Sequence, residues 1–325
     1  MLKSIPDVKQ MIDSGETLLL AGSAAALSQL PSGNWIGGSI SYFMDEDGGV
    51  NTDSGIFVTQ VPPSALSTRI KEYGADGLQE LYSDAPTSGF TFLIVPSGAP
   101  FLQAFARNAP DCKGFLLRPV VGWVTGVPVP EIGKAKAIVV DGRTGRTTSD
   151  TALAMHIELP ENRFAELEII NIFKPGTGPA IRFPSTGFSA TTCEVDGQPS
   201  NLAEYMASLK IGKELPLTAD YCGSIVNVSL QSVDQATGTV HFYAPVFPGI
   251  EYRFAAAVGD YAQAFAQAIP AQHDTLFSCN CILNYLYGEL EGKHTGGVTG
   301  PITFGEIAHQ LLNQTLVQLN IREIV

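Results

Sequence analysis

The residues whose types could do chemistry are concentrated near the C-terminal end of the chain, between Thr275 and Leu319. Small and polar residues recur there inside otherwise apolar runs. Burying such groups costs free energy unless they are hydrogen-bonded, so a packed segment that keeps them predicts a binding site or a polar network. The candidate site residues in this segment are Ser278, Cys279, Asn280, Cys281, Thr303, Gly305, Glu306, His309 and Asn313.

Cys279 and Cys281 form a Cys-x-Cys pair on a predicted strand. Side chains two residues apart on a strand point to the same face, so two thiolates could together hold a soft metal. A structural zinc site needs four ligands, and the sequence offers no second cysteine pair. The pattern therefore predicts two buried thiols and no bound metal, since free cysteine is among the most buried residue types.

Cys279 could instead act as a nucleophile, which requires a lowered pKa and a base within reach. His309 is the candidate base, and Glu306 would orient it. These two residues stand three apart, so they share one face if their segment is helical. The neighbours Leu276 and Phe277 are apolar, however, and burial favours the neutral thiol. We predict that Cys279 lines a site without carrying turnover.

A second cluster of small residues, Gly37, Gly38 and Ser39, falls on a predicted strand in the first half of the chain. Glycine inside a strand often marks a close backbone approach. Absent side chains leave room for a ligand, so this cluster is predicted to face the same cavity as Ser278–Asn280. Arg253 is a further candidate because a lone arginine on an apolar strand could hold a carboxylate bidentately. An internal salt bridge or an exposed strand face is the alternative.

Motifs for cofactors and for common hydrolases are missing from the sequence. The glycine-rich residues 296–300 lack the lysine and hydroxyl of a phosphate-binding loop, and residues 33–38 do not follow the dinucleotide pattern. No Gly-x-Ser-x-Gly elbow and no His-Glu-x-x-His motif occurs. We expect no cofactor.

Composition excludes several classes of partner. The 325 residues carry a net charge of −13, with 45% hydrophobic and 16% charged residues. This is the composition of a packed globular protein, and the acidity argues against binding nucleic acid or an anionic membrane surface. No apolar run reaches the length of a membrane span, so we expect no membrane insertion. Acidic residues precede the apolar Thr17–Leu27, unlike a secretory signal. Together with an odd number of scattered cysteines, this predicts a cytoplasmic protein.

Strand and helix patterns alternate along the whole chain. Residues 17–22 read as a strand and 24–30 as a short helix, whereas 64–73 and 76–82 read as helices. Hairpins are at least as frequent as crossovers, which predicts an α/β (mixed α+β) fold of mixed sheets with helices packed outside. Both halves show a similar order of elements. We therefore expect two similar domains, 1–165 and 166–325, packed over one interface.

Several short elements resemble the FIST (F-box and intracellular signal transduction) family. They are FSCNC, the block TFGEIAHQLLNQTLVQL and the upstream RFPSTGFSATTCEVDGQPSNLAEYM. The family's phenylalanine-serine-cysteine, glycine-glutamate-isoleucine and asparagine-glutamine-threonine elements stand here as Phe277–Cys279, Gly305–Ile307 and Asn313–Thr315. The family's arginine-glycine after the cysteine is replaced by Cys281–Leu283. LLLAGSAAALSQLPSGNWIGGSISYF resembles the N-terminal half of the family more loosely.

This resemblance implies a ligand-sensing module. The expected function is that of a non-catalytic, cytosolic small-molecule-binding protein for sensing and signal transduction. Its ligand would be an amino acid or a related metabolite, and a signalling protein would be a possible partner. The alternatives are a cysteine-dependent hydrolase or acyl-transfer enzyme that uses Cys279 with His309, and a scaffold in which the candidate site is only packed core.

Overall fold

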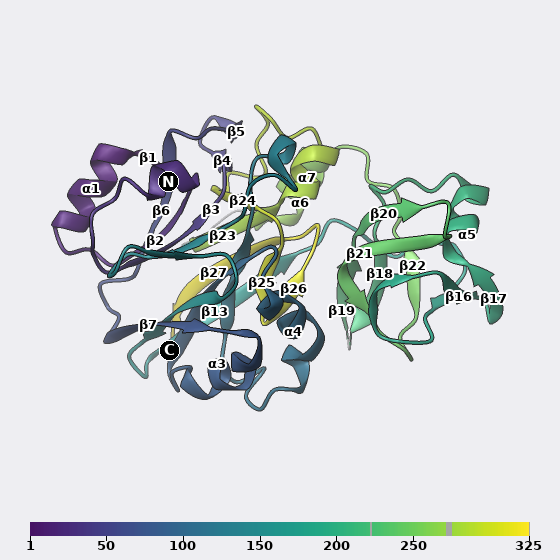
Figure 1. The fold of residues 1–325 in the computed structure, drawn as a ribbon, viewed down its shortest axis with the longest axis horizontal. Coiled ribbons are helices and arrows are strands. Elements are labelled where there is room, and N and C mark those ends of the chain that lie inside the picture. The colour runs from purple at the N-terminus through teal and green to yellow at the C-terminus, as the bar shows by residue number, and fades with distance from the viewer. Residues whose placement is uncertain (222, 271–274, 325) are drawn as a thin grey trace.

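The chain forms a large body and a smaller lobe in the computed structural model, which describes residues 1–221, 223–270 and 275–324 (Figure 1). Three six-stranded sheets build the body, and one six-stranded and one three-stranded sheet build the lobe. Each body sheet contains one parallel pair of strands joined through a helix, and its other pairs are antiparallel. The expected mixed α/β fold with mixed sheets is confirmed.

Sheet I contains the first strand–helix–strand unit, formed by β2 (Leu18–Gly22), α2 (Ala24–Leu27) and β3 (Trp35–Ser39). The hydroxyl of Ser23 caps α2 by accepting a hydrogen bond from the main-chain N–H of Ala26. The outer face of the sheet is covered by α1 (Ile5–Asp13) and α2. The other strands of this sheet are β1 (Leu2–Ser4), β6 (Gly55–Gln60), β10 (Val139–Asp141) and β11 (Arg146–Thr148).

Sheet II repeats the unit with β8 (Gly89–Pro96), α4 (Pro100–Asn108) and β9 (Val120–Thr125). Its outer side packs against α4 and α3 (Leu78–Asp84). The other strands of this sheet are β26 (Gln310–Leu312), β25 (Glu306–Ala308), β12 (Ala152–Glu158) and β7 (Ser67–Tyr73). Three short 3₁₀ helices, η1 (Ala75–Gly77), η2 (Ala109–Asp111) and η3 (Val129–Glu131), lie between these elements in the chain.

Sheet III carries the third unit, formed by β23 (Thr275–Cys281), α7 (Ile282–Tyr287) and β24 (Gly300–Thr303). Phe265 of α6 (Tyr261–Ala268) packs with Ile170 and Leu316 of this sheet. The other strands of this sheet are β13 (Arg163–Ile170), β27 (Leu316–Glu323), β4 (Tyr42–Asp45) and β5 (Gly48–Asn51).

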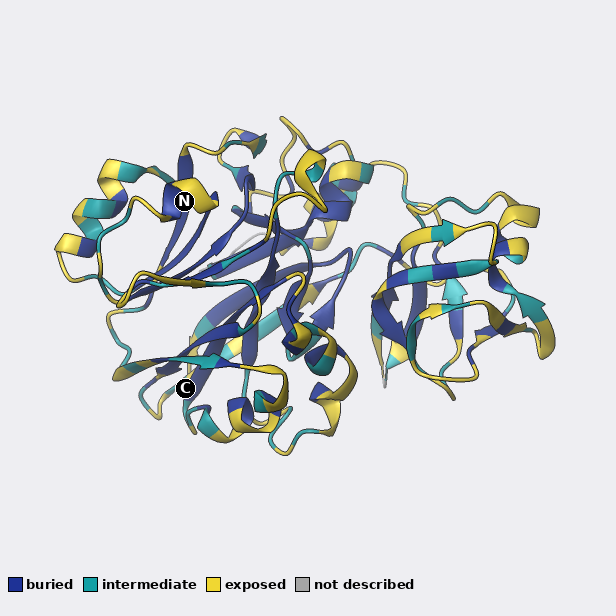
Figure 2. Ribbon diagram, in the orientation of Figure 1, coloured by how far each residue is buried: buried dark blue, intermediate teal, exposed yellow. Residues whose placement is uncertain are grey.

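One continuous core joins the three body sheets. It includes Leu19 and Ile36 of sheet I, Phe92 and Trp123 of sheet II, and residues of sheet III such as Phe277. The rings of Phe92 and Phe277 meet edge-to-face, with centroids 4.8 Å apart. Figure 2 shows the body strands largely buried, while the helices expose their outer turns.

The halves of the chain share sheets in this structure. Sheet II combines β25 and β26 with strands from before residue 165, and sheet III combines β4 and β5 with the C-terminal strands. This arrangement is not that of two similar domains, 1–165 and 166–325, packed over one interface. The reason is that strand pairing is decided by contacts between distant segments, which a local pattern of elements does not contain.

The lobe is one continuous insertion between β13 and α6. Its core is formed by residues such as Phe183, Met206 and Tyr252 and is separate from the body core. The elements of the lobe are β14 (Ile181–Arg182), β15 (Gly187–Ala190), β16 (Thr192–Val195), β17 (Gln198–Asn201), α5 (Leu202–Leu209), β18 (Leu217–Tyr221), β19 (Ser224–Val228), β20 (Leu230–Asp234), β21 (Thr239–Val246) and β22 (Tyr252–Phe254).

Two neighbouring chain segments connect the lobe with the body. The main-chain N–H of Gly176 donates to the carbonyl of Phe254 at 2.9 Å, and the N–H of Ala256 donates to the carbonyl of Lys174 at 2.8 Å. The outgoing and returning chains are therefore hydrogen-bonded side by side. None of the helices in the described parts of the chain is long and apolar enough to cross a membrane.

Two segments differ from their predicted structure. Residues 67–73, within the predicted helix 64–73, form β7, because the antiparallel ladder with β12 satisfies their backbone groups. The segment after Gly305 is the hairpin of β25 and β26, with His309 at its tip in the left-handed region (φ +59°). Glu306 and His309 therefore do not share a helix face.

Candidate functional site

A cavity of about 900 Å³ lies between the body and the lobe, and we call it the interlobe cleft. The body contributes the end of α4, the segment after β13 and the hairpin of β25 and β26. The lobe contributes β19, the end of β21 and the residues that follow it. Cavities of this size at the boundary between two folding units are a usual place for a small-molecule site.

Most of the wall of the interlobe cleft is apolar. Phe115, Phe173 and Leu311 line it from the body, and Pro245 and Phe247 line it from the lobe. A ligand that covers these side chains would remove apolar surface from water, which is the main favourable term in binding an apolar molecule.

A pair of asparagines connects the two sides of the cleft. The amide of Asn171, from the body, donates to Oδ1 of Asn227, from the lobe, at 2.9 Å, and the amide of Asn227 donates back at 3.0 Å. Asn227 is 1% exposed. Its amide also lies 3.2 Å from the main-chain oxygens of both Asn313 and Gln314. One lobe side chain thus satisfies several buried groups of the body.

Gln314 completes this junction from the body side. Its side chain is fully buried and bonds twice to the lobe. Its Oε1 accepts from the hydroxyl of Ser229 at 2.7 Å, and its Nε2 donates to the main-chain oxygen of Glu214 at 3.1 Å. Its backbone is left-handed (φ +50°), a conformation that non-glycine residues rarely adopt. The turn at Asn313 and Gln314 therefore attaches the lobe to the body.

His309 places an imidazole at the wall of the cleft. Its Nδ1 lies 3.3 Å from the main-chain oxygen of Phe115, and its ring meets the Phe115 ring edge-on. Burial lowers the pKa of His309, which favours the neutral imidazole. A carbonyl only accepts hydrogen bonds, so Nδ1 carries the proton in the neutral form and Nε2 is an acceptor. The cleft therefore offers one imidazole acceptor to a ligand.

The rim of the cleft carries charged side chains. Arg107, Lys174 and Asp111 line it and are exposed. The guanidinium of Arg107 lies over the ring of Phe188 at 5.2 Å. Neither Arg107 nor Lys174 forms an ion pair within the described ranges of the chain. The rim thus has an excess of positive charge in a chain that is acidic as a whole.

Glu306 forms a separate buried cluster where sheets II and III meet. Its carboxyl is fully buried, and Oε2 accepts from the N–H and the hydroxyl of Thr315 at 3.2 and 2.8 Å. The hydroxyl of Thr303 lies 3.5 Å from Oε1. Burial raises the pKa of Glu306 to about 8, against the opposing effect of these hydrogen bonds. Glu306 is therefore mostly protonated at neutral pH.

The two cysteines of the Cys-x-Cys pair face the same buried region. Cys279 is 1% exposed and Cys281 is 2% exposed. Burial, and then the nearby Glu306, raises the pKa of both thiols well above its ordinary value. The Cys279 thiol donates to the main-chain oxygen of Gly122 at 3.7 Å, and His309 bonds to Phe115 instead. This is the environment of a packed neutral thiol.

The comparison with known protein families assigns the chain as a whole. Residues 3–322 match the model of DUF6976, a family of unknown function. The chain belongs to the DUF6976 family. Because this match covers nearly the whole chain, the expected membership of the FIST family is wrong. Short glycine-containing and apolar elements carry a high false-positive risk when they are matched without their structural context. No curated protein matches the chain.

The DUF6976 protein does not bring the two predicted small-residue clusters around one cavity. A Cβ on Gly38 would come within 2.7 Å of Thr125, Ile94 and Trp123, so side chains of sheet II fill the space there. The hydroxyl of Ser39 donates to the main-chain oxygen of Gly126 at 2.9 Å. Gly37 packs against Leu27 and Trp35 in the same way. These glycines allow sheets and helices to approach closely.

The other predicted site residues are dispersed. Arg253 lies on β22 of the lobe and forms a salt bridge with Glu251 at 2.8 Å. This is the salt-bridge alternative that the sequence left open for Arg253. Ser278 lines a different cavity in the body. Gly305 has a positive φ of +155°, which residues with a side chain rarely adopt, and a Cβ there would lie 3.1 Å from both Leu311 and Val124.

Asn280 and Asn313 keep amide atoms without a hydrogen-bond partner in the described structure. Asn280 is 3% exposed, and its Oδ1 accepts from the N–H of Cys281 at 2.7 Å and from the amide of Asn284 at 2.9 Å. Asn313 donates to the main-chain oxygen of Leu312 at 2.9 Å. Of the predicted residues, His309 alone lines the interlobe cleft.

The sequence reasoning missed Asn171, Asn227 and Gln314 as junction residues. Asn171 and Asn227 each stand inside an apolar run, such as the segment SIVNVSL around Asn227, whereas Gln314 stands between the polar Asn313 and Thr315. A polar amide in a predicted buried strand is the signal that could have found them, because such a group requires a partner. Which partner it has depends on the tertiary fold.

Proposed function

We propose that the DUF6976 protein binds a small, largely apolar molecule in the interlobe cleft, without turning it over. The observation that carries this proposal is the cleft itself, with about 900 Å³ between mostly apolar walls and a few polar groups. Small-molecule sites combine these features, and the polar groups fix the orientation of the ligand.

The polar groups narrow the chemistry of this ligand. Nε2 of His309 would accept a hydrogen bond from a hydroxyl or amine group. At the rim, Arg107 and Lys174 favour a ligand with a carboxylate or another anionic end. An amphipathic organic acid fits both features, and this includes an apolar amino acid derivative.

A sensory role is supported by how the lobe is attached. The lobe is joined to the body by two neighbouring chain segments and by the turn at Asn313 and Gln314. A ligand that contacts both sides of the cleft would favour the lobe position in which both contacts form. A partner protein could read that position. Location in the cytosol, expected from the sequence, stays a prediction.

Enzyme chemistry at Cys279 receives no support from the geometry of the described residues. The thiol is buried, burial raises its pKa, and its hydrogen-bond partner is a carbonyl. A catalytic cysteine requires a populated thiolate and access for a substrate.

Nile red, an apolar fluorophore, tests the binding proposal. Ser224 lines the cleft and is exposed, so Ser224→Trp should fill part of the cleft while the lobe keeps its fold. Ser189→Trp is the matched control, because Ser189 is also exposed on a lobe strand but does not line the cleft. We expect saturable binding that Ser224→Trp weakens by about tenfold or more, while Ser189→Trp leaves it unchanged. Equal affinities of the two variants would refute the cleft as the site.

A further inference from the structure

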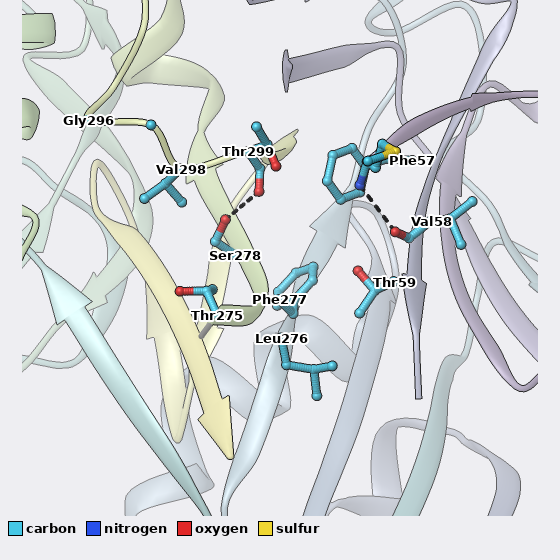
Figure 3. Close-up of a pocket in the computed structure, with 12 residues that line it drawn as sticks. Phe57, Val58, Thr59, Thr275, Leu276, Phe277, Ser278, Gly296, Val298 and Thr299 are labelled. Carbon is cyan, nitrogen blue, oxygen red and sulfur yellow. Dashed lines mark hydrogen bonds between the residues drawn. The ribbon is translucent and has the colours of Figure 1, made fainter. Parts of the chain in front are cut away.

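A second cavity lies inside the body, and the proposed function does not use it. It has a volume of about 470 Å³ and lies between β6 of sheet I and β23 of sheet III (Figure 3). The loop at residues 296–299 forms its third side. We call it the body pocket. It shares no lining residue with the interlobe cleft.

The body pocket exists because the edge of β23 is only partly covered. One edge of β23 pairs with β27 along most of its length. On the other edge, the parallel partner β24 pairs only with Asn280 and Cys281. Residues 275–277 therefore have no strand partner on that edge within the described structure. Backbone groups of an uncovered edge are ready hydrogen-bonding sites.

Thr59 supplies a hydroxyl that faces the pocket. The residue is 5% exposed and lines the pocket from β6. Its hydroxyl has no hydrogen-bond partner among the described residues. In Figure 3 this side chain lies between Phe57 and Leu276, with its oxygen toward the cavity. The hydroxyl is therefore free to donate to, and accept from, a molecule bound in the pocket.

Further hydroxyl groups surround the same space. The Ser278 hydroxyl donates to the main-chain oxygen of Thr299 at 2.6 Å, as Figure 3 shows, and so can still accept a hydrogen bond. Thr275 also lines the pocket, and its buried Oγ1 has no partner among the described residues. Beside them, a Cβ on Gly297 would meet nothing within 4 Å, so the loop leaves open space there.

Most other side chains that line the body pocket are apolar. The α-amino group of Met1 also lies at the wall and donates to the main-chain oxygen of Val58 at 3.3 Å, and burial lowers its pKa to about 5, which favours the neutral amine at pH 7. Phe57 and Phe277 contribute aromatic rings, and Val298 contributes an aliphatic group. None of the described side chains that line the pocket carries a formal charge. At neutral pH an ionic ligand would therefore lose its hydration without meeting a charged side chain.

From these features we infer that the body pocket binds a neutral, polyhydroxylated small molecule of the sugar or polyol class. Hydroxyl groups of such a ligand can both donate and accept, which matches Thr59, Ser278 and the free strand edge. The C–H faces of a sugar ring pack on aromatic side chains. A volume of about 470 Å³ lies within the range of small-molecule sites.

The test uses the full chain with D-glucose and myo-inositol as neutral probes and D-gluconate as the charged counterpart, by calorimetry and ligand-observed NMR. We expect saturable binding of at least one neutral probe and none of gluconate. Thr59→Val removes the hydroxyl at nearly constant shape and should weaken binding about tenfold. Thr125→Val is the matched control, because Thr125 is fully buried and its Oγ1 is also unpartnered, but it lies outside the pocket.

A second variant keeps the test decisive if Thr59→Val does not fold. Thr299→Tyr places a ring at the pocket from the loop, and it leaves the main-chain oxygen that Ser278 uses. Binding should then be lost. Failure of both neutral probes to bind overturns the inference, as does gluconate binding of equal strength. Binding that neither Thr59→Val nor Thr299→Tyr weakens overturns it as well.

Discussion

The two cavities of this protein differ in what forms their walls. The interlobe cleft has one wall from the body and one from the lobe, and its rim is charged. The body pocket lies within a single folding unit, between strands and a loop of the body, and its lining side chains carry no charge. We therefore expect a ligand in the cleft to change the position of the lobe and a ligand in the pocket to stabilise the body.

Buried amide side chains also differ between the junction with the lobe and the interior of the body. At the cleft, Asn227 and Gln314 are fully engaged in hydrogen bonds that join the two parts. In the body, Gln318 and Asn320 of β27 are equally buried, yet both atoms of each amide lack a partner among the residues described. The first pair holds the lobe in place, and the second pair contributes no side-chain hydrogen bond to stability.

The largest expected effect concerns the protonation of Glu306. Its folded-state pKa of about 8 lies above the ordinary value of 4.5, so the folded protein holds a proton that the unfolded chain releases. The contribution of Glu306 to stability is thus fully present below about pH 4.5 and is lost as pH rises through about 8, by at most roughly 1.4 kcal/mol per pH unit. β25 carries Glu306, and Ala308 of the same strand lines the cleft. We therefore expect that, as pH rises, ligand binding in the cleft weakens before ligand binding in the body pocket does.

Urea unfolding at a series of pH values measures this effect. Glu306→Gln keeps an acceptor for Thr315 and should remove most of the pH dependence between about pH 5 and 8. The exposed Glu161→Gln is the control and should leave the profile unchanged. A wild-type profile identical to that of Glu306→Gln across this range would show that Glu306 is ionised in the folded protein.

The next largest effect separates the two kinds of buried amide. Asn227→Leu leaves Asn171 and the carbonyls of Asn313 and Gln314 without their partner, which should cost about 2–3 kcal/mol and weaken ligand binding in the cleft. Asn320→Leu is the matched control, since Asn320 is also 1% exposed but makes no side-chain hydrogen bond within the described chain. It should be neutral or stabilising. Equal losses in urea unfolding would refute the distinction.

A smaller effect is expected at Cys279. Replacing this buried thiol by serine introduces a hydroxyl into an apolar site and should cost about 1–2 kcal/mol, while affinity in both cavities stays the same. In the native protein, a thiol reagent at pH 7 should modify the partly exposed Cys112 well before Cys279 or Cys281. Peptide mass spectrometry identifies the modified residue. Fast labelling of Cys279 would revive its role as a nucleophile.

The smallest effect is expected at Arg253. Its ion pair with Glu251 is partly exposed, and such pairs contribute less than about 1 kcal/mol. Arg253→Met should change neither the urea midpoint appreciably nor binding in either cavity. A loss of ligand affinity in this variant would show that the lobe surface around β22 takes part in recognition.

The local elements of the body could be predicted from the sequence. The strand–helix–strand unit around Ala24 follows from an apolar run, a capping serine and a second apolar run. Ser67–Tyr73 could not be assigned, because its strand form depends on pairing with β12, more than 70 residues away. Residues 306–312 look helical by spacing, but they complete sheet II by pairing with β9.

The candidate site was harder to predict than the fold. The sequence correctly marks the segment after Thr303 as rich in buried polar groups, including Glu306 and Asn313. The interlobe cleft, however, combines α4, the segment after β13, β19 and the hairpin after Gly305, and no local pattern connects these segments. The small residues at 37–39 were misleading because close packing and an open cavity both use glycine.

The claim that ligand binding occurs at the interlobe cleft is tested most directly by hydrogen exchange with and without bound Nile red. We predict slower exchange in residues 308–312 of the body and 223–228 of the lobe, with no change in residues 57–59 and 275–278 of the body pocket. Protection confined to the body pocket, or protection on only one side of the cleft, would contradict it.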